Sequence, residues 1–498
     1  MKFGQILEDP IAPGGLVEWT PHVHGGLAAW SRDQRPTSHN HEQHLRSAFE
    51  YRARTRREGG RESWLGVVIE FDEPLSIPAI RATLLRWIDR HEVLRTHVTL
   101  TGNGLARLST APGTVGLKMD RIGWYNESGP LVEQIAGAFD RATAPLHWPA
   151  YLFATVGRES SFTLLFAADH SLVDGYSLIM AQHELVTLYR SARDHSHAAL
   201  PEVGSYVDFS AEERRSADDV GPDHPAVAAW SAFLRAGAGD MPPFLAGPSG
   251  TRIAPDAEPP DPATDPPQQS VSGVVADDDA TTRFAAACAA AGGTVTAGIL
   301  AVLAIVHHRQ TGDAEFRCVL PRHTRNDPRW LTSLGWFVAV APFCLDMSDS
   351  PTFEQAVARA TVELTHSRQG ASLPFLRVAE LIGFRGAPRF VISFIDTRYA
   401  PGAAEADAGR ARVIRSHSYS RDEVLIWINR TPSGLRYSAR FPIESEPSAI
   451  DAAAATTVEL GPSTSLVDPH PNPQPVQTYL RNFTAFIREV GDSGSPSR

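Results

Sequence analysis

The most informative stretch of this sequence reads Ala168-Asp169-His170-Ser171-Leu172-Val173-Asp174-Gly175. It follows an apolar run over residues 161–168, which has the length and composition of a buried strand. It precedes residues 176–193, where Leu178, Ala181, Leu185 and Leu188 fall on one helical face. The sequence therefore predicts a strand, a tight turn closed by glycine and a helix in direct succession. Such turns present functional side chains on a rigid scaffold.

His170 lies inside this predicted turn and is the candidate for chemistry. An imidazole with an ordinary pKa of about 6.5 is a competent general base near neutral pH. Asp174 opens the helix, where its carboxylate can cap the first turn or pair with an arginine. A second interpretation stays open on these residues alone, because the pattern has few fixed positions. In it, His170 is an ordinary surface histidine and Asp174 a simple helix cap.

The length of 498 residues exceeds that of a usual single hydrophobic core, so two domains are expected. We place them at residues 1–190 and 191–498. The stretch 241–269 is rich in proline and aspartate and predicts a flexible segment. A shorter patch, residues 401–409, also has the composition of a linker.

Charge and cysteine content exclude several classes of protein. The net charge is −11 with no basic block, so neither nucleic acid nor an anionic membrane surface is an expected partner. Three cysteines without CxxC spacing argue against a disulfide framework or a zinc knuckle. No secretory signal is visible at the N-terminus, and we expect a cytoplasmic protein. Residues 285–306 carry no charge, but Gly292-Gly293-Thr294 interrupts them, which predicts two buried helices rather than a transmembrane span.

Further short motifs accompany the His170 segment in a fixed order along the chain. They are Arg90-His91-Glu92-Val93-Leu94-Arg95-Thr96, Tyr206-Val207-Asp208-Phe209, Trp230, the stretch 312–325, Gly335-Trp336-Phe337-Val338, Leu373-Pro374-Phe375 and the strand-like 389–398. Together with the His170 segment, which is similar to the HHxxxDG signature, they resemble the superfamily of condensation domains and polyketide-associated acyltransferases. The resemblance covers about residues 36–445.

The resemblance implies an α/β fold of two chloramphenicol-acetyltransferase-like sandwich lobes, arranged in a V with a central tunnel. His170 would lie midway along the tunnel as the catalytic base. Asp174 and Gly175 would support its loop, with Asp174 paired to the arginine of the PxxxR turn, Arg325 by spacing or Arg322 nearby. The tunnel would be lined by Gly335, Trp336 and Phe337.

One residue departs from the family signature, because Asp169 replaces its first histidine. We expect a structural role for Asp169, although a carboxylate beside His170 could also orient the ring or raise its pKa. His39, His41 and His44 lack the spacing and companions of a metal site, and no metal is expected. We assign residues 40–45 a packing or substrate-lining role. His91, Tyr206 and Trp230 are expected to be structural.

The implied activity is acyl transfer from a CoA or carrier-protein thioester to a hydroxyl of a lipid, sugar or polyketide. No cofactor is expected, since the thioester is a substrate. A separate acyl carrier protein or polyketide synthase is a possible partner, and the enzyme is expected to be a monomer. Two alternatives remain: an amide-forming condensation enzyme of nonribosomal peptide biosynthesis, and a catalytically silent module that docks a carrier protein.

Overall fold

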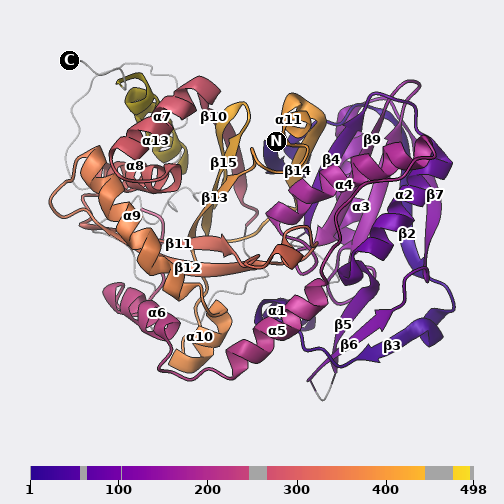
Figure 1. Ribbon diagram of the computed structural model, residues 1–498, viewed down its shortest axis with the longest axis horizontal. Helices are drawn as coiled ribbons and strands as arrows, with labels where there is room; N and C mark the ends of the chain where they lie inside the picture. Colours follow the sequence, from indigo (N-terminus) through magenta and orange to yellow (C-terminus); the bar gives the residue numbers. More distant parts are fainter. Residues whose placement is uncertain (1, 56–63, 102–103, 246–265, 443–474, 494–498) are drawn as a thin grey trace, which may run out of the picture.

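Two mixed α/β lobes, each built on one large sheet, make up the computed structural model of the protein (Figure 1). The structure describes residues 2–55, 64–101, 104–245, 266–442 and 475–493. Of the predicted flexible segment 241–269, residues 246–265 lie outside this description.

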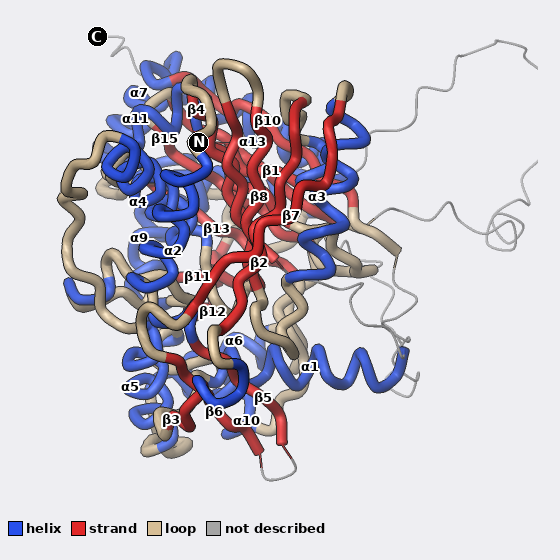
Figure 2. Tube along the Cα trace, turned by 90° about the vertical axis from the view of Figure 1, so that its right-hand side faces the viewer, coloured by secondary structure: helices blue, strands red, loops and turns tan. Residues whose placement is uncertain are grey.

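The first sheet has seven strands. In spatial order they are β1 (Lys2–Gln5), β14 (Ala411–Arg415), β4 (Trp64–Phe71), β9 (Phe162–Asp169), β8 (Tyr151–Gly157), β2 (Gly14–Val23) and β7 (Val115–Tyr125). β1 pairs parallel with β14, and the other neighbours are antiparallel. Figure 2 shows α2 (Ile77–Arg90) and α4 (Gly175–Arg193) on one side of this sheet and α3 (Ser128–Ala142) on the other.

The central strand β9 is buried along its whole length, which explains its uninterrupted apolar sequence. Successive side chains of a strand point to opposite faces of the sheet. Leu164 and Phe166 accordingly join the core beneath α2 and α4, whereas Leu165 and Ala167 join the core beneath α3. Because helices cover both faces, β9 has no polar side and ends in the middle of the lobe.

The second sheet has six strands. Their order is β10 (Gln269–Asp277), β16 (Gly434–Phe441), β15 (Val424–Thr431), β13 (Phe390–Asp396), β11 (Glu315–His323) and β12 (Val338–Asp346). One core contains residues of α7 (Asp278–Ala290), α8 (Val295–Thr311), α9 (Phe353–Gly370) and α13 (Pro475–Ser493). A separate core joins Val319 and Val391 to α6 (Pro225–Ala236) and α10 (Phe375–Ile382).

The remaining elements are short or lie between the lobes. A small sheet is formed by β3 (Trp30–Asp33), β6 (Gly104–Thr110) and β5 (Thr96–Thr101). Helices α1 (His39–Thr55) and α5 (Tyr206–Asp218) lie near it (Figure 1). Single helical turns are η1 (Ile6–Glu8), η2 (Gly26–Ala29), η3 (Glu92–Arg95), η5 (Pro328–Trp330), α11 (Ala403–Glu405) and η6 (Ala406–Arg410). The last two occupy residues 403–410, so the linker predicted over 401–409 is largely helical.

The predicted break in the uncharged stretch separates α7 from α8. Gly292 has a left-handed φ of +76°, and the Thr294 hydroxyl caps α8 by accepting a hydrogen bond from the Ala297 amide at 3.3 Å. Within the described parts of the chain, no single helix is long and apolar enough to cross a membrane. α7 and α8 meet that criterion as a pair, bent by 90°.

β14 joins the two halves of the chain. It comes from the second half of the sequence but lies between β1 and β4 of the first sheet (Figure 1). The division at residue 190 thus stays a prediction about folding units, and the sheet of the first lobe needs a strand from beyond it.

Candidate active site

The His170 loop leaves the end of β9 and runs directly into α4. β9 ends at Asp169 between β4 and β8, and α4 begins at Gly175. The His170 side chain is half-buried, and its Nδ1 is buried and makes no hydrogen bond to another described residue. This leaves Nε2 as the ring nitrogen available to a substrate. Burial is the largest influence on the pKa of His170 and lowers it, and the net shift is downward although the residue's own backbone raises it.

Asp174 is both a helix cap and one half of a buried ion pair. Its Oδ1 accepts from the Ser177 amide at 2.7 Å. Arg325 donates to its two carboxylate oxygens at 2.6 and 3.1 Å, and the Phe337 amide donates to Oδ2 at 3.0 Å. Arg325 rather than Arg322 therefore makes the pair with Asp174 that the resemblance implied. Burial raises the pKa of the Asp174 carboxyl, Arg325 and Ser177 lower it, and the net shift is downward, so the carboxylate stays ionised.

Arg325 ties the loop to the second lobe. It also donates to the Ser177 hydroxyl at 2.9 Å and to the Ser333 carbonyl at 3.2 Å. Its guanidinium lies over the Phe337 ring, 4.2 Å from the centroid. Such a bidentate pair fixes geometry as well as charge.

Asp169 makes its side-chain contacts with the loop backbone and with a histidine of α1. Its Oδ1 accepts from the Ser171 amide at 2.9 Å, and its Oδ2 lies 2.9 Å from Nε2 of His44. Asp169 is fully buried, whereas the His44 side chain is 18% exposed. Burial lowers the pKa of His44 and Asp169 raises it, with a net upward shift. Burial raises the pKa of Asp169 and His44 lowers it, with a net downward shift.

The sequence prediction missed this pair. It gave residues 40–45 a packing or lining role without connecting His44 to Asp169. A carboxylate at the end of a buried strand was the available signal, because a buried charge needs a partner.

The three predicted tunnel residues have different environments. Trp336 is half-buried, and its ring centroid lies 4.4 Å from that of His170 and 5.9 Å from that of His44. Phe337 is fully buried against Tyr206 and Phe209, and its place along the tunnel stays a prediction. Its ring belongs to the core because its amide is held by Asp174.

The two glycines assigned to the site also differ. A Cβ on Gly335 would approach the Tyr206 ring to 2.3 Å, so packing requires glycine there, and its place along the tunnel stays a prediction. A Cβ on Gly175 would make only an ordinary contact of 3.5 Å with Ile395, and its φ is not left-handed. The turn is therefore closed by the Asp174 contacts rather than by glycine.

The motif at residues 90–96 anchors α4 through one buried carboxylate. Glu184 accepts from the Arg90 Nε and the Trp87 Nε1, both at 2.9 Å, and lies 2.6 Å from Nε2 of His91. His91 is 3% exposed, which confirms its structural role. Sequence analysis did not single out Glu184, although an acid among the apolar residues of a buried helix is a signal for such partners.

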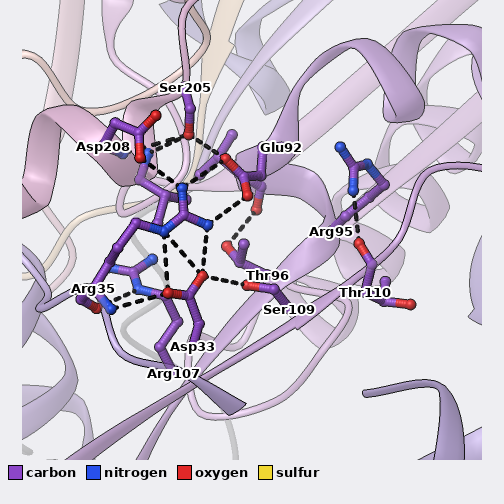
Figure 3. Close-up of polar contacts among 12 residues, drawn as sticks. Asp33, Arg35, Glu92, Arg95, Thr96, Arg107, Ser109, Thr110, Ser205 and Asp208 are labelled. Carbon is purple, nitrogen blue, oxygen red and sulfur yellow. Dashed lines mark hydrogen bonds and ion pairs between the residues drawn. The ribbon is translucent and has the colours of Figure 1, made fainter. Parts of the chain in front are cut away.

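Arg35 links two of the short sequence motifs, residues 90–96 and residues 206–209. It donates to Asp33, to Glu92 of the first motif and to Asp208 of the second (Figure 3). Ser205 contacts the same Glu92 carboxylate. Tyr206 and Trp230 are buried core aromatics, as expected. Across the described residues, no group of three or more His, Cys, Asp or Glu side chains could hold a metal ion.

The sequence matches a known family over most of its length. Residues 57–387 match the family model of the Condensation domain. The chain belongs to the condensation-domain family. It is 28% identical over 409 residues to 2'-acyl-2-O-sulfo-trehalose (hydroxy)phthioceranyltransferase PapA1 of Mycobacterium tuberculosis, covering 80% of this chain and 75% of that protein. It is 24% identical over 306 residues to trehalose-2-sulfate acyltransferase PapA2 of Mycobacterium bovis, covering 60% and 63%.

Solved structures of this family share the fold. PapA2 acyl transferase superimposes with a TM-score of 0.79 at 20% identity, covering 98% of this chain and all of that one. The first condensation domain of the calcium-dependent antibiotic synthetase gives 0.64 at 16% identity, covering 94% and 98%. These likenesses confirm the two-lobed, chloramphenicol-acetyltransferase-like α/β fold. As a condensation-domain protein related to PapA1 and PapA2, the chain is an acyltransferase.

Proposed function

We propose that this condensation-domain acyltransferase esterifies a sugar hydroxyl, taking the acyl group from a CoA or carrier-protein thioester with His170 as general base. The single observation behind the proposal is the half-buried His170 on a locked loop, with Nδ1 enclosed and Nε2 free. The sugar class is suggested by the relatives, whose names specify trehalose derivatives.

The proposed reaction uses one imidazole twice. Nε2 of His170 accepts the proton of the acceptor hydroxyl as its oxygen forms a bond to the thioester carbonyl carbon. The tetrahedral intermediate then expels the thiolate as the C–S bond breaks, and the imidazolium returns the proton to sulfur. A base must be neutral before it can accept a proton. The burial that lowers the pKa of His170 supports this role near neutral pH.

The proposed roles of the neighbours follow from their contacts. Asp174 and Arg325 hold the loop, and neither is proposed to meet substrate, since both are buried. In the pair formed by Asp169 and His44, the imidazole of His44 neutralises a carboxylate next to the base. We propose that Trp336 lines the substrate path, because it is partly exposed and lies against the His170 ring. The central tunnel, the monomeric state and the absence of any cofactor remain proposals.

The test is a product assay by mass spectrometry. Purified protein is incubated with acyl-CoAs of several lengths, with trehalose or trehalose 2-sulfate as the alcohol and a matched amino sugar as the amine. The expected product is an ester whose formation depends on time and enzyme. Exclusive acylation of the amine would replace the proposal with amide formation. A thioester presented on a carrier protein, run in parallel, identifies the donor.

A further inference from the structure

A cavity lined by arginines lies between the small sheet and helices α1 and α5. Its volume is about 420 Å³, within the range of small-molecule sites. Its walls include six arginines: Arg32, Arg35, Arg46, Arg107, Arg214 and Arg215. The carboxylates that line it are Asp33, Glu42 and Asp218. The lining holds six cations and three anions, and with Glu92 and Asp208, which also contact Arg35, the local balance is +1 in a chain whose net charge is −11.

Three of the six arginines are held by carboxylates and form fixed walls. Arg35 is paired with Asp33, and also with Glu92 and Asp208 behind it (Figure 3). Arg214 pairs with Glu42 and Asp218, and Arg46 also pairs with Glu42. These pairs neutralise the acids of the cavity.

Arg107 is the unusual member of the set, because it is buried and makes no ion pair with a described residue, although the charges of Asp33 and Glu92 act on its pKa. It is 4% exposed, and its Nε and Nη2 donate to the carbonyls of Arg35 and Pro36 and to the Thr37 hydroxyl. No carboxylate of a described residue lies within ion-pair distance of it. Burial lowers its pKa to about 10, which still leaves it charged at neutral pH. A buried cation without a partner is costly, and a bound anion would remove that cost.

Two exposed arginines complete the cavity without partners of their own. Arg32 on β3 and Arg215 on α5 also line the cavity, both are exposed, and neither makes an ion pair with a described residue. Guanidinium groups are suited to sulfate and phosphate, whose oxygens accept two parallel hydrogen bonds.

We propose that this cavity is a binding site for a sulfate or phosphate group, held by Arg107, Arg32 and Arg215. The cavity lies across α1 from the candidate active site: Glu42 and Arg46 face it, whereas His44 of the same helix reaches Asp169. A sulfate or phosphate group bound here would belong either to a sulfated sugar acceptor or to a CoA donor. That link to a substrate rests on the proposed function, whereas oxyanion binding does not.

Isothermal titration calorimetry at constant ionic strength tests the proposal. The ligands are sodium sulfate, inorganic phosphate, trehalose 2-sulfate, trehalose and CoA. The test protein is Arg32→Ala/Arg215→Ala, which alters only exposed side chains. The control is Arg121→Ala, which removes an exposed arginine from β7, outside the cavity. We expect wild type and control to bind sulfate or phosphate alike, and the double variant to bind about tenfold or more weakly.

The two substrate ligands identify the source of the anion. A loss confined to trehalose 2-sulfate, with unsubstituted trehalose unaffected, assigns the site to the acceptor, and a loss confined to CoA assigns it to the donor. Arg107→Gln adds a second measurement: sulfate should raise the Tm of wild type but not of this variant. The proposal is overturned if wild type binds none of the anions, or if the double variant and the control bind all of them equally. Acyl transfer that survives in the double variant would leave the role of His170 intact.

Discussion

At the residue scale, the site depends on how four titratable side chains lie close together. His170 lies among His44, Asp169 and Asp174, and each of the three acts on its pKa. Asp174 is neutralised by Arg325 and Asp169 by His44. Asp169, which stands where the signature has its first histidine, is therefore paired with a histidine supplied from α1.

His44→Gln should move the acid limb of the pH–rate profile to higher pH. In the proposed mechanism acylation requires neutral His170, so kcat/KM rises as pH passes through the pKa of His170. Burial lowers that pKa below its ordinary 6.5, His44 lowers it further and Asp169 raises it. The substitution removes a lowering charge and leaves Asp169 unneutralised, and both changes raise the pKa. The measurement is kcat/KM from pH 5 to 8.

A double variant separates this electrostatic effect from simple damage. In His44→Gln/Asp169→Asn the unneutralised carboxylate is gone, so the limb should return toward that of wild type. A limb that stays at the wild-type pH in His44→Gln, or moves to lower pH, contradicts the assigned role of the pair.

At the element scale, the loop keeps its place because α4 is anchored at two points. Asp174 and Arg325 fix its first turn, and Glu184 fixes its middle to α2 and the residues that follow α2. Glu184→Gln should lower the free energy of unfolding by about 1–3 kcal/mol, because Arg90 and His91 lose a buried charged acceptor. Urea denaturation measures the change.

The matched control is Glu405→Gln, at an exposed position 3.8 Å from Arg190 of α4. An exposed pair contributes little, so the control should change the unfolding free energy by less than about 1 kcal/mol. Equal effects in the two variants would show that Glu184 does not anchor α4.

Much of the local structure was predictable because its causes are local. The strand, turn and helix around His170 follow from an apolar run, a capping aspartate and helical spacing, and β9 and α4 match the predicted ranges within a residue. Contacts between distant segments were not predictable in this way. His44 and Asp169 are 125 residues apart in sequence, and neither has a local pattern that names the other. The ion pair of Asp174 and Arg325 was expected only through the family resemblance.

At the scale of the whole molecule, the chain returns from the second lobe to add a strand to the sheet of the first lobe. β14 pairs with both β1 and β4, so the first sheet is incomplete without residues 411–415. No sequence pattern predicted this strand pairing, because the sequence of a short apolar strand does not indicate which sheet it joins. The family resemblance predicted the two-lobed architecture, but it did not predict the order of the strands.

A fragment of residues 1–190 should therefore fail to fold cooperatively by itself. Without β14, the edge of β4 is exposed, and an unpaired apolar edge favours aggregation. Circular dichroism during thermal unfolding, with light scattering, gives the readout. Co-expression with residues 191–498 should restore a soluble complex. A monomeric fragment with a sharp unfolding transition would contradict the expected dependence on β14.

The central claim is that His170 performs the proton transfer, and single-turnover acyl transfer by His170→Ala tests it most directly. Wild type, His170→Ala and the control His197→Ala, which alters an exposed histidine, are compared under one set of conditions with the same acyl thioester and alcohol. We predict that His170→Ala loses about 10²–10⁴-fold in rate while keeping the wild-type Tm, and that the control is unchanged. Acyl transfer by His170→Ala within a few-fold of wild type would contradict the account.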